Sequence, residues 1–470
     1  MKAVIIGGGL AGITAAVALA GAGADVTLLE AKPRLGGATM SFSRDGLVVD
    51  TGQHVFLRCC TAYRGLLDRL GMSAHAPLQN RFDVTVLSPD GRARLRRAKM
   101  PAPLHLGPTL ARYSVLSYPE RIKATRAALA FRGVDPMDPE ADQVRLGDWM
   151  AARGQSEHTR RALWDLITIA TLNVPGDDAS LALAAKVVRT GLLEDAGAAD
   201  IGVPALSLGE LHGAAAQRKL GSLGATVRLN TKVSRIEATG PARFAVSLTR
   251  DDEAIEADAV VLAVPHDAAA KLIPPGALPE STVSGWAGLG AAPIVNVHVI
   301  YDRKVMDLPF AAAVDSPVQW VFDRTRISGM YARGDDRQYL AISLSAADQY
   351  VDQSVAELRE RFVPALAEVL PAARTARVTE FFVTRERRAT FRQEPGCMRL
   401  RPPSATGLPG LVLAGSWTGT GWPDTMESAV RSGLNAVRAL RSANNGDAVT
   451  GVSEVTAEIA GTAKHEEVPS

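Results

Sequence analysis

Three glycines near the start of the chain have the spacing of a turn that holds a diphosphate. Gly7, Gly9 and Gly12 follow the apolar residues 4–6 and open an alanine-rich stretch over residues 13–22. Gly7 would allow a tight turn, Gly9 would leave room for a pyrophosphate, and Gly12 would let the helix pack closely on the strand. The free N–H groups at the start of such a helix suit an anion. The pattern therefore predicts a dinucleotide-binding turn.

An acidic residue stands where a ribose would be recognised. Glu30 ends a second apolar run at residues 26–29, so that strand, helix, strand and acid follow in the order of a dinucleotide-binding unit. A carboxylate at this place accepts hydrogen bonds from ribose hydroxyls. The alternative is a glycine-rich turn in some other α/β fold. Pro33, Gly36 and Gly37 then predict a loop whose backbone passes close to a ligand.

The elements that must position these residues are spread over the chain. Residues 258–265 and 411–415 are almost continuously apolar, which is typical of strands buried on both faces of a parallel sheet. We therefore predict one nucleotide-binding domain built from residues 1–75, 205–275 and 400–442. An extended dinucleotide needs a second anchor far from the first, and a strand, a glycine-containing loop and a helix at residues 411–440 would supply it. This favours FAD over NAD.

Two segments interrupt that domain. Residues 76–204 contain helical patterns at 116–132, 145–153 and 157–172, and residues 276–399 alternate like antiparallel strands. The predicted fold class is α/β: a discontinuous Rossmann-type FAD-binding domain with an inserted helical cap and a mostly antiparallel substrate domain. Residues 443–470 are polar and small, so a disordered tail is predicted.

Composition excludes several classes of protein. The chain has 470 residues and a net charge of +2 with mixed signs, which does not indicate a nucleic-acid partner. Its three cysteines form neither a disulfide framework nor a metal pattern, so no metal is predicted. The first residues do not have the pattern of a secretory signal, and no 18-residue apolar run occurs, so we expect neither a cleaved leader nor a membrane-spanning helix. We expect a cytoplasmic protein, with peripheral contact at the inner face of the membrane as a further hypothesis.

The motifs resemble those of a known group of flavoproteins. GGGLAG, EAKPRLGG, ADAVVLAVP and LAGSWTGTGWPDTMESAVRSG resemble the amine oxidase/phytoene desaturase superfamily of FAD enzymes. More narrowly, VDTGQHVFLRCCTAY, SPVQWVFDR, RERRATF and GTGWPDTMESAVRSG resemble the squalene-associated FAD-dependent desaturases, a group understood as hydroxysqualene dehydroxylases of hopanoid biosynthesis. The resemblance covers about residues 1–442.

The resemblance implies a role for each matching residue. One departure concerns Ser416, because relatives usually carry an acid after the glycine at 415. The implied cofactor contacts are Gly7, Gly9 and Gly12 at the pyrophosphate, Glu30 at the ribose, Arg34, Gly36 and Gly37 along the phosphates and ribityl chain, Val233 at the adenine, Gly415 and Ser416 at the pyrophosphate and ribityl region, and Met426 and Glu427 at the isoalloxazine.

The implied reaction is the reductive removal of a hydroxyl group from hydroxysqualene, an apolar isoprenoid, which gives squalene. A proton donor is required for the leaving hydroxyl. His54 is our preferred catalytic candidate and Asp50 the second; the alternatives are a structural histidine and a helix-capping aspartate. The electron donor remains unknown, with NAD(P)H, a reductase or a quinone as candidates.

Other functions stay open. A carotenoid desaturase or isomerase would share the motifs, and an amine oxidase would need an aromatic pair such as Trp417 and Trp422 beside the flavin. A non-catalytic flavin-binding protein is a third class. The basic and apolar residues 94–132 could rest on a bilayer or form an ordinary helical cap over the substrate.

Overall fold

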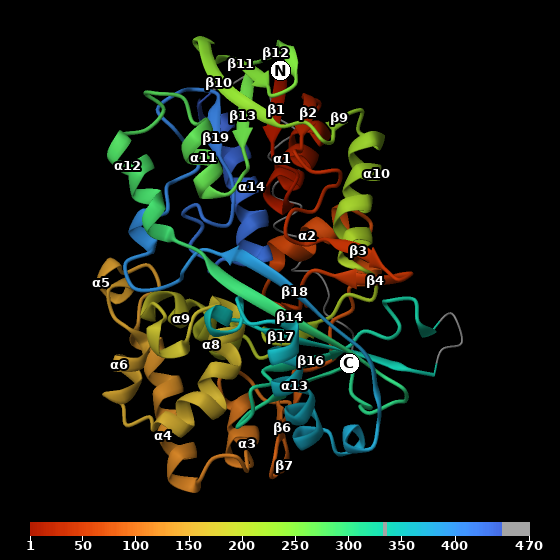
Figure 1. Cartoon of the computed structure of the whole chain (residues 1–470). Helices are drawn as coiled ribbons and strands as arrows, with labels where there is room; N and C mark the ends of the chain where they lie inside the picture. Colours follow the sequence, from red (N-terminus) through yellow and green to blue (C-terminus); the bar gives the residue numbers. More distant parts are fainter. Residues whose placement is uncertain (332–335, 444–470) are drawn as a thin grey trace.

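The structure is a computed structural model that describes residues 1–331 and 336–443. Figure 1 shows a molecule with two ends: the N-terminal strands lie at one end, and a long antiparallel sheet with its helices lies at the other. The tail predicted to be disordered, residues 443–470, lies outside the described residues from position 444 onward.

A five-stranded parallel sheet forms the end that carries the N-terminus. Its strands come from three distant parts of the chain, and β1, β13 and β19 are almost entirely buried and apolar, as expected for strands covered on both faces. The order across the sheet is β19 (Leu411–Leu413), β13 (Ala259–Leu262), β1 (Lys2–Ile6), β2 (Asp25–Leu29) and β9 (Thr226–Arg228). This is the Rossmann-type arrangement that the sequence predicts.

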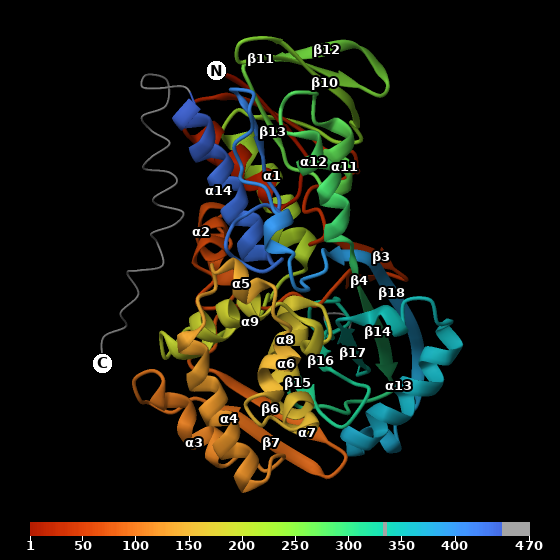
Figure 2. The same cartoon turned by 90° about the vertical axis from the view of Figure 1, so that its left-hand side faces the viewer.

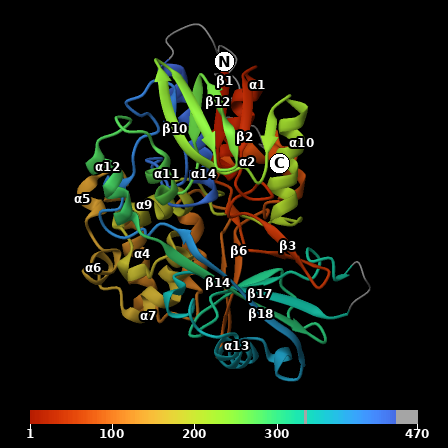
Figure 3. The same cartoon turned by 45° about the horizontal axis from the view of Figure 1, so that its top comes forward.

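Helix α1 (Leu10–Gly21) is the buried centre of this end. It contacts β1 and β2 and is flanked by α14 (Met426–Ala443) and α10 (Ala215–Ser222). Small residues allow the close approach, because a Cβ added at Gly433 of α14 would lie 2.4 Å from the carbonyl oxygen of Ala11. The three-stranded antiparallel sheet of β10 (Val233–Gly240), β11 (Arg243–Leu248) and β12 (Asp251–Ala257) lies beside β1 and β2 (Figure 3).

A seven-stranded sheet dominates the other end. Its pairs are antiparallel except for β15 with β6. The order is β18 (Val378–Thr390), β14 (Ala292–Tyr301), β17 (Gln338–Leu344), β16 (Trp320–Asp323), β15 (Phe310–Ala313), β6 (Asp83–Ser88) and β7 (Gly91–Arg96). Strands β6 and β7 belong to residues 76–204, which we expected to form a helical cap. Since β6 pairs with β15, this segment shares the seven-stranded sheet with residues 276–399. The mixed fold class itself is confirmed.

Helices surround this second sheet on two sides. Helix α13 (Val355–Val369) packs on one side, and a group of short helices lies on the other (Figure 2). This group contains α3 (Gly107–Ala111), α4 (Tyr118–Ala130), α5 (Pro139–Asp142), α6 (Leu146–Ala151), α7 (Glu157–Thr159), α8 (Asp165–Leu172) and α9 (Leu181–Val188).

The remaining elements connect the two ends. They are α2 (Thr61–Arg69), α11 (His266–Leu272) and α12 (Glu280–Gly285), the hairpin of β3 (Ser41–Arg44) and β4 (Leu47–Asp50), and the short pair β5 (Phe56–Leu57) and β8 (Ile201–Gly202). In the part of the chain that the structure describes, no helix is both long and apolar enough to cross a membrane.

Candidate flavin site and its surroundings

The glycine turn between β1 and α1 is required by contacts within the protein as well as by its predicted ligand. Gly7 has φ +108°, and a Cβ there would lie 2.3 Å from the carbonyl oxygen of Ala263. A Cβ on Gly12 would lie 1.9 Å from the carbonyl oxygen of Gly7. By contrast, a Cβ on Gly9 meets only Gly37 Cα at 3.9 Å. Gly7 and Gly12 therefore hold the turn closed, while Gly9 leaves free space above it.

Glu30 lies at the end of β2 with its carboxylate fixed by backbone groups. The N–H groups of Gly8 and Lys32 donate to its two oxygens at 2.6 and 2.7 Å. A carboxylate can accept further hydrogen bonds, so these contacts orient it and leave acceptor capacity for ribose hydroxyls. The Glu30 carbonyl accepts the N–H of Thr231 at 2.8 Å, which holds the start of β10 near this end. Val233, the predicted adenine contact, is the first residue of β10.

The loop after Glu30 passes directly over the glycine turn. Gly36 and Gly37 have φ of +111° and +59°, and a Cβ on Gly37 would lie 2.9 Å from Gly9 Cα. The backbone of Gly36 also donates to the carbonyl of Gly8 at 2.8 Å. Arg34 is exposed and its Nε lies 2.9 Å from the sulfur of Met40. The loop thus carries the Arg34 guanidinium close to the free space above Gly9.

The second predicted anchor follows β19. Gly415 has φ +141°, and its N–H donates to Ser432 Oγ at 2.8 Å, which ties the turn to α14. A Cβ there would lie 2.4 Å from Trp417 Nε1. The carbonyl of Ser416 accepts hydrogen bonds from the buried Arg401 at 2.9 Å and from Ser428 Oγ at 3.1 Å. Strands β1 and β19 both run parallel to β13, one on each side of it. The turns that follow them, at Gly7 and Gly415, therefore lie at the same carboxyl end of the sheet.

The side chain of Glu427 serves another helix. Its buried carboxylate accepts the N–H groups of Ala62 at 3.1 Å and Tyr63 at 2.8 Å, at the beginning of α2, and it pairs with Arg431 at 2.7 Å. Burial raises the pKa of this carboxyl. Glu427 therefore caps α2. At the start of α14, Met426 and the backbone are left for the predicted isoalloxazine contact.

Asp50 and His54 have different surroundings. The buried Asp50 carboxylate pairs with Arg324, accepts Ser41 Oγ–H, and accepts the N–H of Leu208 at 3.0 Å. These contacts favour the structural alternative for Asp50, because they join β4 to the segment that leads into α10. His54 lies against Gly52, and burial lowers the pKa of its imidazole. A lowered pKa favours the neutral imidazole, which donates a proton less readily than the protonated form. The catalytic roles of His54 and Asp50 remain predictions.

A cluster that the sequence analysis missed contains buried polar atoms without partners. Both amide atoms of Gln53 and Oδ1 of Asn296 are buried and make no hydrogen bond within the part of the chain that is described. Asn296 Nδ2 donates to the carbonyl of Thr51 at 3.0 Å, so β14 and the Gln53 segment meet. Buried polar groups normally find partners, and the polar edge of a flavin would supply them. A polar residue inside the apolar strand 292–301 was the available signal.

Asp424 is a second residue that the sequence analysis missed. It lies between Ser416 and Met426, and it is half-buried. The Phe391 N–H donates to its Oδ2 at 2.9 Å, and the Ser416 side chain hydrogen-bonds to it as well. Burial raises the pKa of this carboxyl. Asp424 and Ser416 are eight positions apart in the chain, so the sequence carried no local signal for this contact.

Trp417 and Trp422 do not share an environment. Trp417 is buried; its Nε1 donates to the Val264 carbonyl at 2.9 Å, and its ring packs edge-on to Trp286 at 4.8 Å. The ring of Trp422 instead lies against the cations of Arg431 and Lys186. The aromatic pair expected of an amine oxidase is therefore not formed by these two rings.

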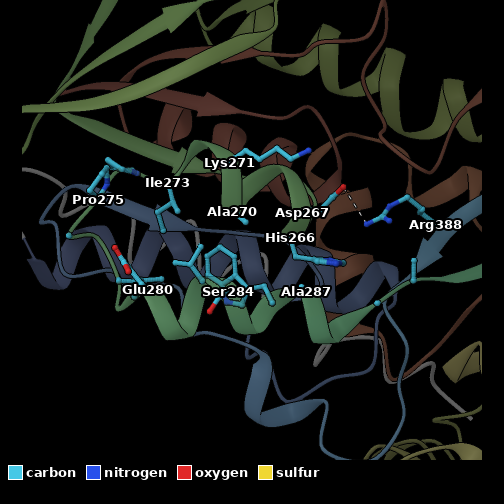
Figure 4. A pocket seen from close by; sticks show the side chains of 17 residues that line it. His266, Asp267, Ala270, Lys271, Ile273, Pro275, Glu280, Ser284, Ala287 and Arg388 are labelled. Carbon is cyan, nitrogen blue, oxygen red and sulfur yellow. Dashed lines mark ion pairs between the residues drawn. The ribbon is translucent and has the colours of Figure 1, made fainter.

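A groove of about 740 Å³ lies between α11 and α12 (Figure 4). Ala270, Ile273 and Trp286 form part of its apolar wall, and Arg388 pairs with Asp267 at 3.3 Å at its rim. None of the predicted cofactor contacts lines this groove. It is separated from the Gly415 turn by the Trp286–Trp417 contact.

Comparisons with known proteins agree with this geometry. The family model described as flavin containing amine oxidoreductase matches residues 10–441. The hydroxysqualene dehydroxylase of Sinorhizobium fredii is 29% identical over 94% of this chain and 98% of its own length. The 15-cis-phytoene desaturase of Solanum lycopersicum is 24% identical over 94% of this chain and 77% of its own length. Putrescine oxidase, 21% identical, superimposes with a TM-score of 0.69 over 95% of this chain and 99% of its own.

Proposed function

Since the chain belongs to the flavin containing amine oxidoreductase family, and is thereby an FAD-dependent oxidoreductase, we propose that it converts hydroxysqualene to squalene by reductive dehydroxylation in hopanoid and squalene biosynthesis. The observation that carries this proposal is the match along 98% of a hydroxysqualene dehydroxylase. The phytoene desaturase match covers a smaller share of that relative, 77%, at lower identity.

The residues present fit the cofactor. Free space above Gly9, the fixed carboxylate of Glu30 and the unpaired polar atoms of Gln53 and Asn296 offer the kinds of group that bind a pyrophosphate, a ribose and a flavin edge. When bound and reduced, FAD supplies a hydride. In this proposal Gln53 and Asn296 orient the flavin edge, and Gly415 and Ser416 hold its chain.

Dehydroxylation also requires a proton for the hydroxyl that leaves as water. We place Asp424 in this role ahead of His54 and Asp50, because its carboxyl lies beside the Ser416 side chain at the second predicted flavin anchor and burial raises the pKa of that carboxyl. Asp50 pairs with Arg324, and burial lowers the pKa of His54, which disfavours the protonated imidazole as a donor. The balance is one hydride and one proton added to the alcohol, which releases squalene and water. His54 is left to contact the flavin or the substrate in its neutral form.

The partners and location follow from the substrate. An apolar isoprenoid dissolves in membranes, so the enzyme would act from the cytoplasm as a peripheral protein at the inner face of the membrane. The proposal assigns no electron donor for the reduction of the flavin. The α11–α12 groove is open and has charged residues at its rim, so we do not assign the substrate to it.

An anaerobic single-turnover reaction tests the proposal. Reduced enzyme is mixed with hydroxysqualene while flavin absorbance is recorded and the extracted lipid is identified by mass spectrometry. We expect flavin reoxidation at the rate of squalene formation. Reduction of the oxidised enzyme by phytoene, with no turnover of hydroxysqualene, would instead identify a desaturase.

Variants of Asp424 test its proposed role in the same assay. Asp424→Asn should slow squalene formation by roughly 10²–10⁴-fold, the usual range for loss of a general acid, while it retains bound FAD. Asp267→Asn, which neutralises a carboxylate at the rim of the groove, is the matched control and should react normally. Equal rates for Asp424→Asn and wild type would exclude Asp424 as the donor.

A further inference from the structure

The surface of α4 is unusual because its large apolar side chains face solvent. Tyr118, Ile122 and Leu129 are 72%, 39% and 44% exposed, whereas Ala124 and Ala127 on the same helix are buried. Successive residues of an α-helix are separated by about 100°, so the three exposed residues share one stripe, roughly opposite the two alanines. The helix thus packs inward through small residues and presents its apolar stripe outward.

Neighbouring elements extend this stripe. Met100 and Leu104, in the connection between β7 and α3, are 41% and 58% exposed. Helix α3 contacts both β7 and α4, and Figures 1 and 2 show these three elements together at the end of the molecule away from the N-terminal strands. We define the α3–α4 surface as Met100, Leu104, Tyr118, Ile122 and Leu129 with the cations between them.

The charge of this segment differs from that of the whole chain. Residues 92–132 contain ten Lys and Arg side chains and one acid, Glu120, so their net charge is +9 against +2 for all 470 residues. Several of these basic residues are exposed and have no ion-pair partner among the residues that the structure describes; they include Lys99, Arg112, Lys123, Arg126 and Arg132. Cations therefore border the apolar stripe without being neutralised.

We propose that the α3–α4 surface docks on a bilayer that contains anionic lipid. Exposed apolar side chains gain free energy by entering the interface, and bordering Lys and Arg side chains are attracted to lipid phosphates. A nucleic acid would be drawn by the cations alone and would leave the apolar stripe in water. A bilayer satisfies both features. The inference rests on these exposed residues and stands independently of the substrate proposed above.

Vesicle flotation tests the surface without any substrate. Holoenzyme is mixed at low salt with vesicles of equimolar phosphatidylglycerol and phosphatidylcholine, or of phosphatidylcholine alone. Flotation is expected with the anionic vesicles and should weaken as salt is added. The charge variant Lys123→Gln/Arg126→Gln/Arg132→Gln should bind roughly 100-fold more weakly, since each cation near an anionic surface contributes about fivefold. The apolar variant Tyr118→Ser/Ile122→Ser/Leu129→Ser should bind at least tenfold more weakly.

Matched controls separate this surface from general effects. Arg218→Gln/Arg235→Gln/Arg243→Gln removes the same charge from exposed positions of α10, β10 and β11 at the opposite end, and Tyr331→Ser removes an exposed aromatic ring elsewhere. Both should float like wild type, and bound FAD with an unchanged melting midpoint shows that each variant is folded. The proposal would be overturned if the wild-type protein did not float, or if the Arg218/Arg235/Arg243 control lost as much binding as the charge variant. It would also be overturned if the Tyr118/Ile122/Leu129 variant bound like wild type. Binding of duplex DNA that the charge variant alone abolishes would overturn it as well.

Discussion

At the scale of single residues, the glycine turn makes a sharp prediction. Gly12→Ala should lower the affinity for FAD at least tenfold, because a Cβ 1.9 Å from the Gly7 carbonyl forces the turn to move. Gly21→Ala, at the other end of α1, meets no atom within 4 Å and is the matched control. The ratio of flavin to protein absorbance after gel filtration measures the outcome. Normal loading of Gly12→Ala would contradict the steric argument.

Residue types predicted part of the site and not the rest. Gly7, Gly12, Gly36 and Gly37 could be identified from spacing, because glycine is needed where φ is positive or another backbone lies close, and this requirement is local. Gln53 and Asp424 could not, because their significance comes from burial and missing or distant partners, and Asn296 was marked only by its polar type within an apolar strand. Pairing across the fold, such as Asp50 with Arg324, leaves no trace in a single sequence.

At the scale of secondary-structure elements, two buried tyrosine–histidine pairs hold elements together. Tyr63 of α2 hydrogen-bonds His212 at 2.7 Å, and Tyr339 of β17 hydrogen-bonds His298 of β14 at 2.8 Å. Burial lowers the pKa of each histidine to about 3. Both imidazoles are therefore neutral in the folded protein, while the unfolded chain takes up protons near the ordinary pKa of about 6.5.

The sign of the resulting pH dependence follows. Below about pH 6.5 the unfolded state binds more protons, so stability falls as the pH is lowered toward the folded pKa near 3. Each histidine should cost about 2 kcal/mol between pH 6.5 and 5. Urea unfolding across this range measures it. His298→Gln should reduce the slope, whereas His75→Gln, at an exposed position, should leave it unchanged; identical slopes for all three proteins would refute the linkage.

Element types were predictable where packing agrees with local preference. The apolar strands β1, β13 and β19 form where the sequence predicts them. The predicted helix over residues 157–172 instead contains a wider π turn at Arg160–Trp164 between α7 and α8. The Trp164 ring, at the end of this turn, contacts Phe131 and hydrogen-bonds to Gln155. These contacts lie outside residues 157–172, so the periodicity of apolar residues within that stretch cannot reveal the turn.

At the scale of the whole molecule, FAD should act as a stabilising component. Its predicted contacts come from β1–α1, the Gln53 segment, β14 and the Gly415 turn, so removal of FAD leaves several distant elements without shared partners. The melting midpoint should fall in apoprotein and rise with added FAD, by about 1.4 kcal/mol of stability for each tenfold excess over Kd. Riboflavin, which lacks the diphosphate and adenosine, should stabilise less. Equal effects of the two ligands would contradict the Glu30 and Gly9 assignments.

The five-stranded sheet also has a consequence for the order in which the protein is made. Its central strands appear first, but β19 and α14 occupy residues 411–443 and leave the ribosome last. A nascent chain that already displays the complete Gly7–Glu30 unit still lacks the Gly415 turn and the start of α14. If the Gly415 turn and the start of α14 hold the flavin as predicted, lasting cofactor capture must wait until residues 411–443 have been made, and chains that terminate before them should not retain flavin.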